Sequence, residues 1–285
     1  MKYAVNQKSE FKKQLRLAPG YLLLIFWLAF TVVLIGWIIL ASLSTTKEVF
    51  SNQLVQSGLH FENYVRVITK HKLGVYFVNS LLYSLSGCVG IILVAAPAAY
   101  VLGRFRFRGK ALVNSTFVTA MSIPSVMLIL PLFKMATAAH LTGSRWLLII
   151  LYICINVPFG VFFLTGFFMS LPKALEEAAE IDGCTPSKAF WRIMFPLAQP
   201  GVVTLTIFNF INIWNEYFMA LIFANKTEMR TVSTGLQAIV QSMKYSGDWA
   251  GLFAGVVVVF LPTFILYIFL SNKIIAGVTG GAVKE

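Results

Sequence analysis

The chain has 285 residues, of which 58% are hydrophobic and only 12% are charged, and its mean hydropathy is +0.78. Soluble domains carry about 25% charged residues, so this composition excludes an ordinary soluble domain and is typical of a protein that crosses a membrane several times. The net charge of +12 could fit nucleic acid, but the basic residues lie in short connections between apolar blocks, which is the placement that orients membrane spans.

Six apolar blocks are long enough for membrane-spanning helices, which need about 20 mostly apolar residues. The predicted spans are about 21–43, 75–101, 111–138, 145–168, 200–224 and 251–273. They leave an N-terminal tail at 1–20, a long loop at 169–199 and a C-terminal tail at 274–285. The expected fold is therefore all-α: a polytopic membrane protein with six transmembrane helices and one long loop.

The first block follows Lys12, Lys13 and Arg16, so a cleaved signal peptide is the alternative for it. Signal peptides have apolar regions of about 7–15 residues followed by a small-residue cleavage site. The block Tyr21–Leu43 is longer, carries no charge and runs on without such a site. We therefore expect an uncleaved first span.

An even number of spans places both ends of the chain on the same side of the membrane. Tails and loops on that side carry fourteen Lys and Arg residues, against eight on the opposite side. Cytoplasmic loops carry the basic excess, and Arg104–Lys110, RFRFRGK, is its densest group. We predict a multi-pass protein embedded in lipid, with both termini cytoplasmic.

The segment Gly103–Ala111, GRFRFRGKA, nearly matches a phosphate-binding loop, which requires G-x-x-x-x-G-K-[ST]. Five residues separate Gly103 from Gly109, and Ala111 stands where a hydroxyl must bind magnesium. The chain therefore has no visible ATP site, and any ATP-driven step must come from a partner. Three histidines without ligand spacing and three cysteines predict neither a metal site nor a disulfide framework.

The third span contains Pro124 and Pro131. Each removes a backbone donor and kinks a helix, and such kinks survive where neighbouring helices or a cavity satisfy the freed backbone groups. Two interpretations remain open for this span: a packed bundle, or a helix that lines a translocation pathway.

The loop at 169–199 predicts two short helices joined by a turn. Ser170 suits the N-cap of the first helix, Pro172 its first turn, and Gly183 its left-handed stop. Its apolar stripe is Leu171, Leu175, Ala178 and Ala179, and Lys173 and Glu177 are spaced for an ion pair. Thr185 and Pro186 begin the second helix; Phe190, Ile193 and Met194 form its apolar side, and Pro196 ends it.

An amphipathic hairpin resting on lipid is the alternative for this loop. Interfacial helices favour Lys and Arg on their polar face, whereas the first helix is acidic, with Glu176, Glu177, Glu180 and Asp182. An acidic helix of small residues fits a cleft on a basic or polar partner protein better.

Several motifs resemble those of one family. Glu177-Ala-Ala-x-x-Asp182-Gly183, followed by Phe190, Ile193 and Pro196-Leu197, resembles the EAA loop of binding-protein-dependent ABC importer permeases. Trp214-Asn-Glu-Tyr217 and the tail Ala276–Lys284 are similar to the second permease of the maltose-type, carbohydrate-uptake branch, and Asn79-Ser80 and Ile123-Pro124…Leu130-Pro131 also fit. The resemblance covers essentially the whole chain, with Cys184 where the family usually has Ala.

The resemblance implies a subunit of a heteromeric sugar importer of a bacterial-type cell (inner) membrane, not an enzyme. Its partners would be a second homologous permease, two cytoplasmic ATPase subunits that hold ATP and magnesium, and an extracellular or periplasmic sugar-binding protein. The first loop helix would be a coupling helix seated in a groove of the ATPase. The coupling residues would be Glu176, Glu177, Ala178, Ala179, Asp182, Gly183 and Pro196.

The fifth span carries Asn209, Asn212 and Glu216 at helical spacing, flanked by Trp214 and Asn215. Polar groups at membrane depth face the bundle or a water-filled cavity. One interpretation is a substrate pathway, because amides, carboxylates and aromatic faces suit sugars. The other is that these residues join this span to its neighbours or to the partner permease.

Three other functions are alternatives. An ABC permease for a polyol or a glycerol phosphate is one, although a phosphorylated solute needs a basic lining and only Lys134 lies within a predicted span. A membrane-embedded enzyme needs paired catalytic groups inside the spans, and no predicted span has Asp or His in its interior. A secondary transporter has no use for an acidic docking hairpin. We therefore predict no catalytic residues.

Overall fold

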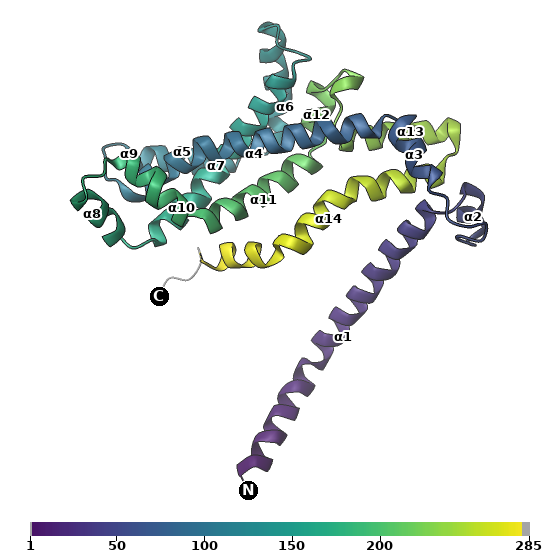
Figure 1. Ribbon diagram of the computed structural model, residues 1–285, viewed down its shortest axis with the longest axis horizontal. Coiled ribbons are helices and arrows are strands. Elements are labelled where there is room, and N and C mark those ends of the chain that lie inside the picture. The colour runs from purple at the N-terminus through teal and green to yellow at the C-terminus, as the bar shows by residue number, and fades with distance from the viewer. Residues whose placement is uncertain (1, 281–285) are drawn as a thin grey trace. The chain divides into compact units, whose positions relative to one another are not determined.

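The computed structural model describes the backbone of residues 2–280 and the side chains of residues 17–243 and 245–271. Within these residues the chain is helical and has no strand (Figure 1). The helices are α1 (Lys2–Ser42), α2 (Thr46–Ser51), α3 (Glu62–Thr69), α4 (Leu73–Arg104), α5 (Lys110–Met121), α6 (Ser125–Ala138), α7 (Arg145–Ser170), α8 (Ala174–Ile181), α9 (Pro186–Ala189), the π-helix η1 (Phe190–Met194), α10 (Phe195–Leu197), α11 (Gln199–Asn215), α12 (Phe218–Phe223), the 3-10 helix η2 (Thr227–Met229), α13 (Val232–Ser246) and α14 (Trp249–Gly280).

The all-α, multi-span prediction is confirmed. Four helices of the described chain are long and apolar enough to cross a membrane: α1 from Leu17, α4, α7 and α14 up to Ser271. Two bent pairs pass the same test together, α5 with α6 at 98° and α9–α10 with α11 at 72°. If each bent pair is one crossing, the total is the six spans expected from the sequence.

The boundaries of two terminal spans differ from the prediction. Helix α1 already begins at Lys2, so part of the expected N-terminal tail continues the first span as helix. Helix α14 runs on to Gly280, and the predicted C-terminal tail from 281 onward lies outside the described residues. Both helices extend because the flanking sequence has no strong stop, and Pro19 is accommodated within α1.

The third and fifth spans are broken where the sequence predicts continuous helices. Between α5 and α6 the break falls at Ser122–Pro124, because a residue before proline is disfavoured in the helical conformation and proline has no donor. Pro131 lies inside α6 without ending it. The fifth span stops at Asn215 and restarts as α12 at Phe218.

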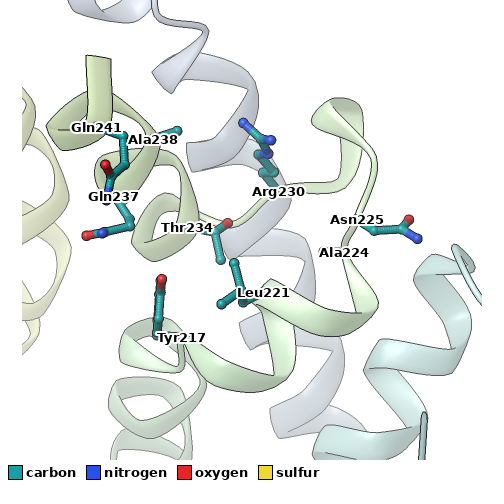
Figure 2. Close-up of a pocket in the computed structure, with 9 residues that line it drawn as sticks. All are labelled: Tyr217, Leu221, Ala224, Asn225, Arg230, Thr234, Gln237, Ala238 and Gln241. Atoms are coloured by element: carbon teal, nitrogen blue, oxygen red, sulfur yellow. The ribbon is translucent and has the colours of Figure 1, made fainter. Parts of the chain in front are cut away.

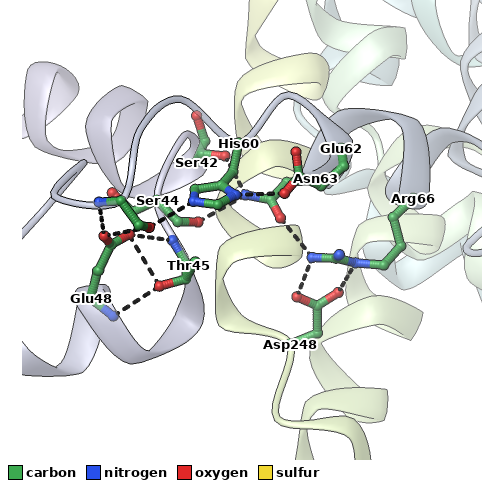
Figure 3. Close-up of polar contacts among 10 residues, drawn as sticks. Ser42, Ser44, Thr45, Glu48, His60, Glu62, Asn63, Arg66 and Asp248 are labelled. Atoms are coloured by element: carbon green, nitrogen blue, oxygen red, sulfur yellow. Dashed lines mark hydrogen bonds and ion pairs between the residues drawn. The ribbon is translucent and has the colours of Figure 1, made fainter.

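The described chain divides into two compact units, the first made of the residues up to Val67 together with Met243–Val257, and the second of Ile68–Ser242 with the chain after Val257. In the first unit, a polar network surrounds the connection after α1 (Figure 3). The Asn63 amide donates to the Ser42 and Ser44 carbonyls, both at 2.9 Å. Arg66 pairs with both oxygens of Asp248, at 2.7 and 2.9 Å. This network joins α3 to the end of α1 and the start of α14.

Glu48 organises the remainder of that connection (Figure 3). It completes a capping box with Thr45 at the start of α2. Its other oxygen accepts from the Ser57 backbone N–H at 2.6 Å and from the Ser57 hydroxyl at 2.7 Å. The hydrogen bonds from Thr45 and Ser57 lower the pKa of Glu48 to about 2.

The second unit is built on α4, α7 and α11, which lie side by side (Figure 1). Helices α4 and α7 approach closely because small residues face each other, as is common between membrane helices. A Cβ atom on Gly160 of α7 would lie 2.9 Å from the Ala95 Cβ atom of α4. Gly160 therefore has to be glycine for this packing.

Residues near the start of α4 hold the segment around η2. The Asn79 amide donates to the carbonyls of Glu228 and Arg230 at 2.8 and 3.0 Å. The Ser80 hydroxyl accepts from the Val232 N–H at 2.9 Å. Asn79-Ser80, singled out in the sequence as a family pattern, thus fixes the connection between α12 and α13.

Candidate functional site

The long loop folds into the two predicted helices, with a shifted start. Helix α7 continues through Ser170, whose hydroxyl bonds to the Phe167 carbonyl of its own helix. Ser170 is therefore not the N-cap of the loop helix, and α8 begins only at Ala174. Lys173 precedes the helix, so it does not form the ion pair with Glu177 that the spacing predicts.

The stop at Gly183 is confirmed in detail. Gly183 has φ +73, the left-handed conformation that glycine adopts without strain. The Cys184 N–H bonds to the Ala179 carbonyl at 2.8 Å and the Gly183 N–H to the Glu180 carbonyl at 3.0 Å. This is the two-bond Schellman ending of a helix, and it places Asp182 at the C-cap of α8.

The second loop helix starts at Thr185 as predicted but does not end at Pro196. The Thr185 hydroxyl accepts from the Lys188 N–H, and Pro186 occupies the first turn. Pro196 lies inside the final turn, α10, which ends at Leu197. Proline leaves a helical carbonyl without its donor, and the π-helical turn η1 just before it accommodates this.

Helix α8 has a packed face and an exposed face. Leu175 packs against the core cluster around Phe168 and Phe190, and Ala179 is buried. Ala178, predicted to share that apolar stripe, is instead exposed. The exposed face consists of Ala174, Glu177, Ala178 and Ile181 at spacings of three and four residues, and Ile181 is 87% exposed.

Glu176 faces the protein, away from this exposed face. Its Oε2 atom accepts from the Arg104 Nε atom at 2.6 Å, and the Arg104 Nη2 atom pairs with the same oxygen. The Arg104 side chain is only 5% exposed. The sequence-predicted coupling residues therefore separate into two sets: Glu176 and Ala179 pack inward, whereas the others are exposed, namely Glu177, Ala178, Asp182, Gly183 and, on α10, Pro196.

Glu216 lies in the break of the fifth span. Its carboxylate accepts from the backbone N–H groups of Met219 at 2.7 Å and Ala220 at 2.9 Å, so it caps the start of α12. It also accepts from the Tyr152 hydroxyl at 2.9 Å. The broken span exists because one carboxylate both satisfies the free N–H groups of α12 and binds α7.

A small cavity of about 90 Å³ adjoins this break. Its polar lining comes from Ser125, Tyr152, Asn156, Asn212 and Glu216. The Asn212 amide donates to the Asn156 side-chain oxygen at 2.8 Å. Of the predicted pathway residues, Asn212 on α11 and Glu216 just after its end thus line the same cavity.

The other predicted pathway residues lie elsewhere. Trp214 is fully buried, stacks on Phe210 and donates to the Val259 carbonyl at 3.1 Å. Asn209 is buried and its amide donates to the Leu205 carbonyl of its own helix. Asn215 is exposed and donates to the Ile211 carbonyl. Trp214 therefore contacts α14, whereas the hydrogen bond of Asn209 stays within α11.

A larger and more open groove of about 530 Å³ lies between α12 and α13 (Figure 2). Two turns of α13 contribute the exposed amides Gln237 and Gln241, and Tyr217 points its hydroxyl toward this helix (Figure 2). Arg230 and Asn225 complete the polar lining.

Sequence reasoning missed Arg104, Tyr152 and Asn156. Arg104 was counted only as an orienting charge, and nothing local predicts its partner Glu176, which lies 72 residues away. Tyr152 and Asn156 are spaced four residues apart in an apolar span. That polar pair inside a span was the available signal for Asn156.

Comparison with solved structures agrees with this fold. A crystal structure of a bacterial ABC transporter involved in the import of the acidic polysaccharide alginate matches with a TM-score of 0.78 at 22% identity, over 89% of this chain and 94% of that chain. The chain therefore shares the fold of that matched chain.

Sequence comparison gives the family. Residues 91–273 match the model of the binding-protein-dependent transport system inner membrane component. A diacetylchitobiose uptake permease of Streptomyces coelicolor is 32% identical over 94% of this chain and 89% of its own length. A trehalose transport permease of Mycobacterium tuberculosis is 30% identical (91% and 97%), and a sulfoquinovosyl glycerol permease of Agrobacterium fabrum is 32% identical (87% and 87%).

The chain belongs to the family of binding-protein-dependent transport system inner membrane components. It is a membrane permease subunit of an ABC transporter and is not itself an enzyme. Such a subunit works with an ATPase and with a substrate-binding protein.

Proposed function

We propose that this chain is one of two homologous permease subunits of a sugar importer. The other parts are two cytoplasmic ATPase subunits, which hold ATP and magnesium, and an external sugar-binding protein. Relatives named for diacetylchitobiose, trehalose and starch degradation products support sugar as the cargo. The basic excess on the loop side supports a cytoplasmic location for that loop and for both termini.

The observation that carries this proposal is the exposed face of α8. Ala174, Glu177, Ala178 and Ile181 form one stripe, while Leu175 and Ala179 fix the opposite face to the core. An isoleucine that is 87% exposed beside small residues and one acid fits a groove on another protein. Lipid is a poorer match, because a lipid-facing interfacial helix would carry Lys and Arg.

Transport then follows from a difference in affinity. The ATPase pair must hold α8 more tightly in one conformation of the permease than in the other, since a partner with equal affinity for both shifts nothing. ATP binding and hydrolysis on the partner change that preference. Helix α8, capped at Gly183 and packed on α4 and α7, transmits the change to the spans.

The polar groups beside Glu216 support a neutral cargo, and their cavity of about 90 Å³ would have to widen to admit a sugar. Asn156 and Asn212 offer amide groups, and Ser125 offers a hydroxyl, all of which exchange hydrogen bonds with sugar hydroxyls. No Lys or Arg lines this cavity. A glycerol phosphate or similar anion would need a basic group there, so we favour a neutral sugar over the anionic alternative.

A double variant of the exposed stripe tests the docking face, and a second acid on the same helix, Glu180, supplies the control. Glu177→Gln, combined with Ile181→Asp, should abolish co-purification of the ATPase and uptake, because both residues lie on the exposed stripe. Glu180→Gln is the matched control, since Glu180 is also exposed but lies beside the Glu176 side of the helix. The proposal fails if the stripe variant retains both ATPase and uptake.

A cargo test uses Asn212→Ala with competing solutes. We expect weaker uptake and an altered preference among neutral sugars, measured with the companion binding protein present. An unchanged preference, or preferred uptake of a phosphorylated solute, would contradict the assignment of this cavity to sugar.

A further inference from the structure

Arg104 at the end of α4 is buried and contacts two other elements. Its Nη1 atom donates to the Leu171 carbonyl at 2.8 Å and to the Phe168 carbonyl at 3.3 Å. Its Nε atom donates to Glu176 of α8 at 2.6 Å. One guanidinium therefore binds the last carbonyls of α7 and the first turn of the loop helix together.

This arrangement needs arginine. The last carbonyls of a helix have no donors within the helix, and a buried charge must be paired. The planar guanidinium presents five N–H groups in fixed directions, so it can serve carbonyls on one edge and a carboxylate on the other. The compact ammonium of a lysine cannot reach both with the same geometry.

The ion pair between Arg104 and Glu176 borders a cavity. A cavity of about 300 Å³ lies between the end of α4 and α8–α9, lined by Arg104 and Glu176 together with Glu180, Cys184 and Pro186. Tyr100 of α4, which also lines this cavity, packs against Phe190 of η1 at a ring distance of 5.1 Å. Aromatic packing thus holds η1, whereas α8 is held by Leu175 and Ala179 on its packed face and by the charged pair at the edge of the cavity.

We propose that Arg104 is a positioning residue that makes α8 move together with the ends of α4 and α7. Arg104 does not touch ATP or sugar; it acts through Glu176. The inference rests on the proposed docking of an ATPase at α8. It assigns Glu176 to this internal link and leaves Glu177, its neighbour, for the partner.

The test compares Arg104→Ala, Arg104→Lys, Glu176→Gln and the double variant Arg104→Ala/Glu176→Gln in the full transporter in proteoliposomes. Arg106→Ala is the matched control, because Arg106 lies two residues further along the chain, just after α4, and is exposed. Three quantities are measured: ATPase subunit retained, ATP hydrolysed in response to the loaded binding protein, and sugar taken up per ATP.

We expect each single variant to retain the ATPase subunit but to lose about tenfold or more of sugar uptake per ATP, the range of typical coupling energies. The double variant should be no worse than either single variant, because the two residues act as one unit. Arg104→Lys should fall between Arg104→Ala and the native chain. If Arg104→Ala does not accumulate in the membrane, the uptake per ATP of Glu176→Gln and Arg104→Lys tests the inference instead.

Native uptake per ATP in Glu176→Gln and Arg104→Lys would overturn the inference, as would additive losses in the double variant. Failure of the proposed ATPase docking can be distinguished from failure of the role given to Arg104. If the Glu177/Ile181 stripe variant keeps its ATPase, docking at α8 is wrong. If that variant loses its ATPase while the Arg104 variants stay fully coupled, only the role of Arg104 is wrong.

Discussion

Single side chains decide where helices start and stop in this permease. Glu216 and Glu48 are acids that accept backbone N–H groups, the first within a broken span and the second in the connection after α1. Each acid thereby satisfies backbone donors that have no partner within their own helix. Both residues therefore have measurable local effects.

Glu216→Gln should destabilise the folded protein by about 1–2 kcal/mol, because the amide replaces one of the oxygens that cap α12. The measurement is thermal unfolding of the purified subunit in detergent. Asn215→Ala is the control, since Asn215 is exposed and bonds only within α11. Equal stability of the two variants would argue against the capping role of Glu216.

Glu48 gives a prediction about pH. Its folded-state pKa, about 2, lies below its ordinary value of 4.5, so its stabilising effect is fully present above pH 4.5 and is lost as the pH falls through about 2. Hydrogen exchange at the Ser57 amide should therefore accelerate over this window relative to a Glu48→Gln variant, whose side chain does not titrate. A constant difference between the two proteins at all pH values would contradict this prediction.

Element packing depends on small residues between α4 and α7. Gly160→Leu should destabilise the subunit by about 1–3 kcal/mol, because the new side chain collides with Ala95 on α4. Gly166→Leu on the same helix is the control, since nothing lies within 4 Å of a Cβ atom there. The measurement is the fraction of protein that stays monodisperse in size-exclusion chromatography after heating. Equal losses in the two variants would show that the close approach of α4 and α7 does not determine the stability of the subunit.

At the scale of the whole molecule, the orientation in the membrane can be tested directly. In a variant without Cys88, Cys154 and Cys184, single cysteines are placed at two exposed positions, Gln56 and Phe107. An impermeant maleimide should label the cysteine at position 56 in intact cells and the cysteine at position 107 only after permeabilisation. The reverse pattern would invert the orientation that the basic residues predict.

Much of this protein could be predicted from its sequence. Runs of apolar residues predict spans because lipid requires them, and Gly183 and Thr185 predict the turn between the loop helices because caps are local. The breaks of the third and fifth spans are harder to predict from the sequence. Pro124 signalled a kink, but the capping role of Glu216 depends on Tyr152 and on α12 being close to it.

The sequence by itself determined the membrane class, the number of apolar blocks, the charge asymmetry and the acidic loop, since each depends on neighbouring residues. Only the tertiary structure decided which face of α8 is free, that Ala178 is exposed, and that Glu176 binds Arg104. The physical reason is range: caps and hydropathy act over a few residues, whereas the partner of a buried charge is chosen by packing between helices far apart in the chain.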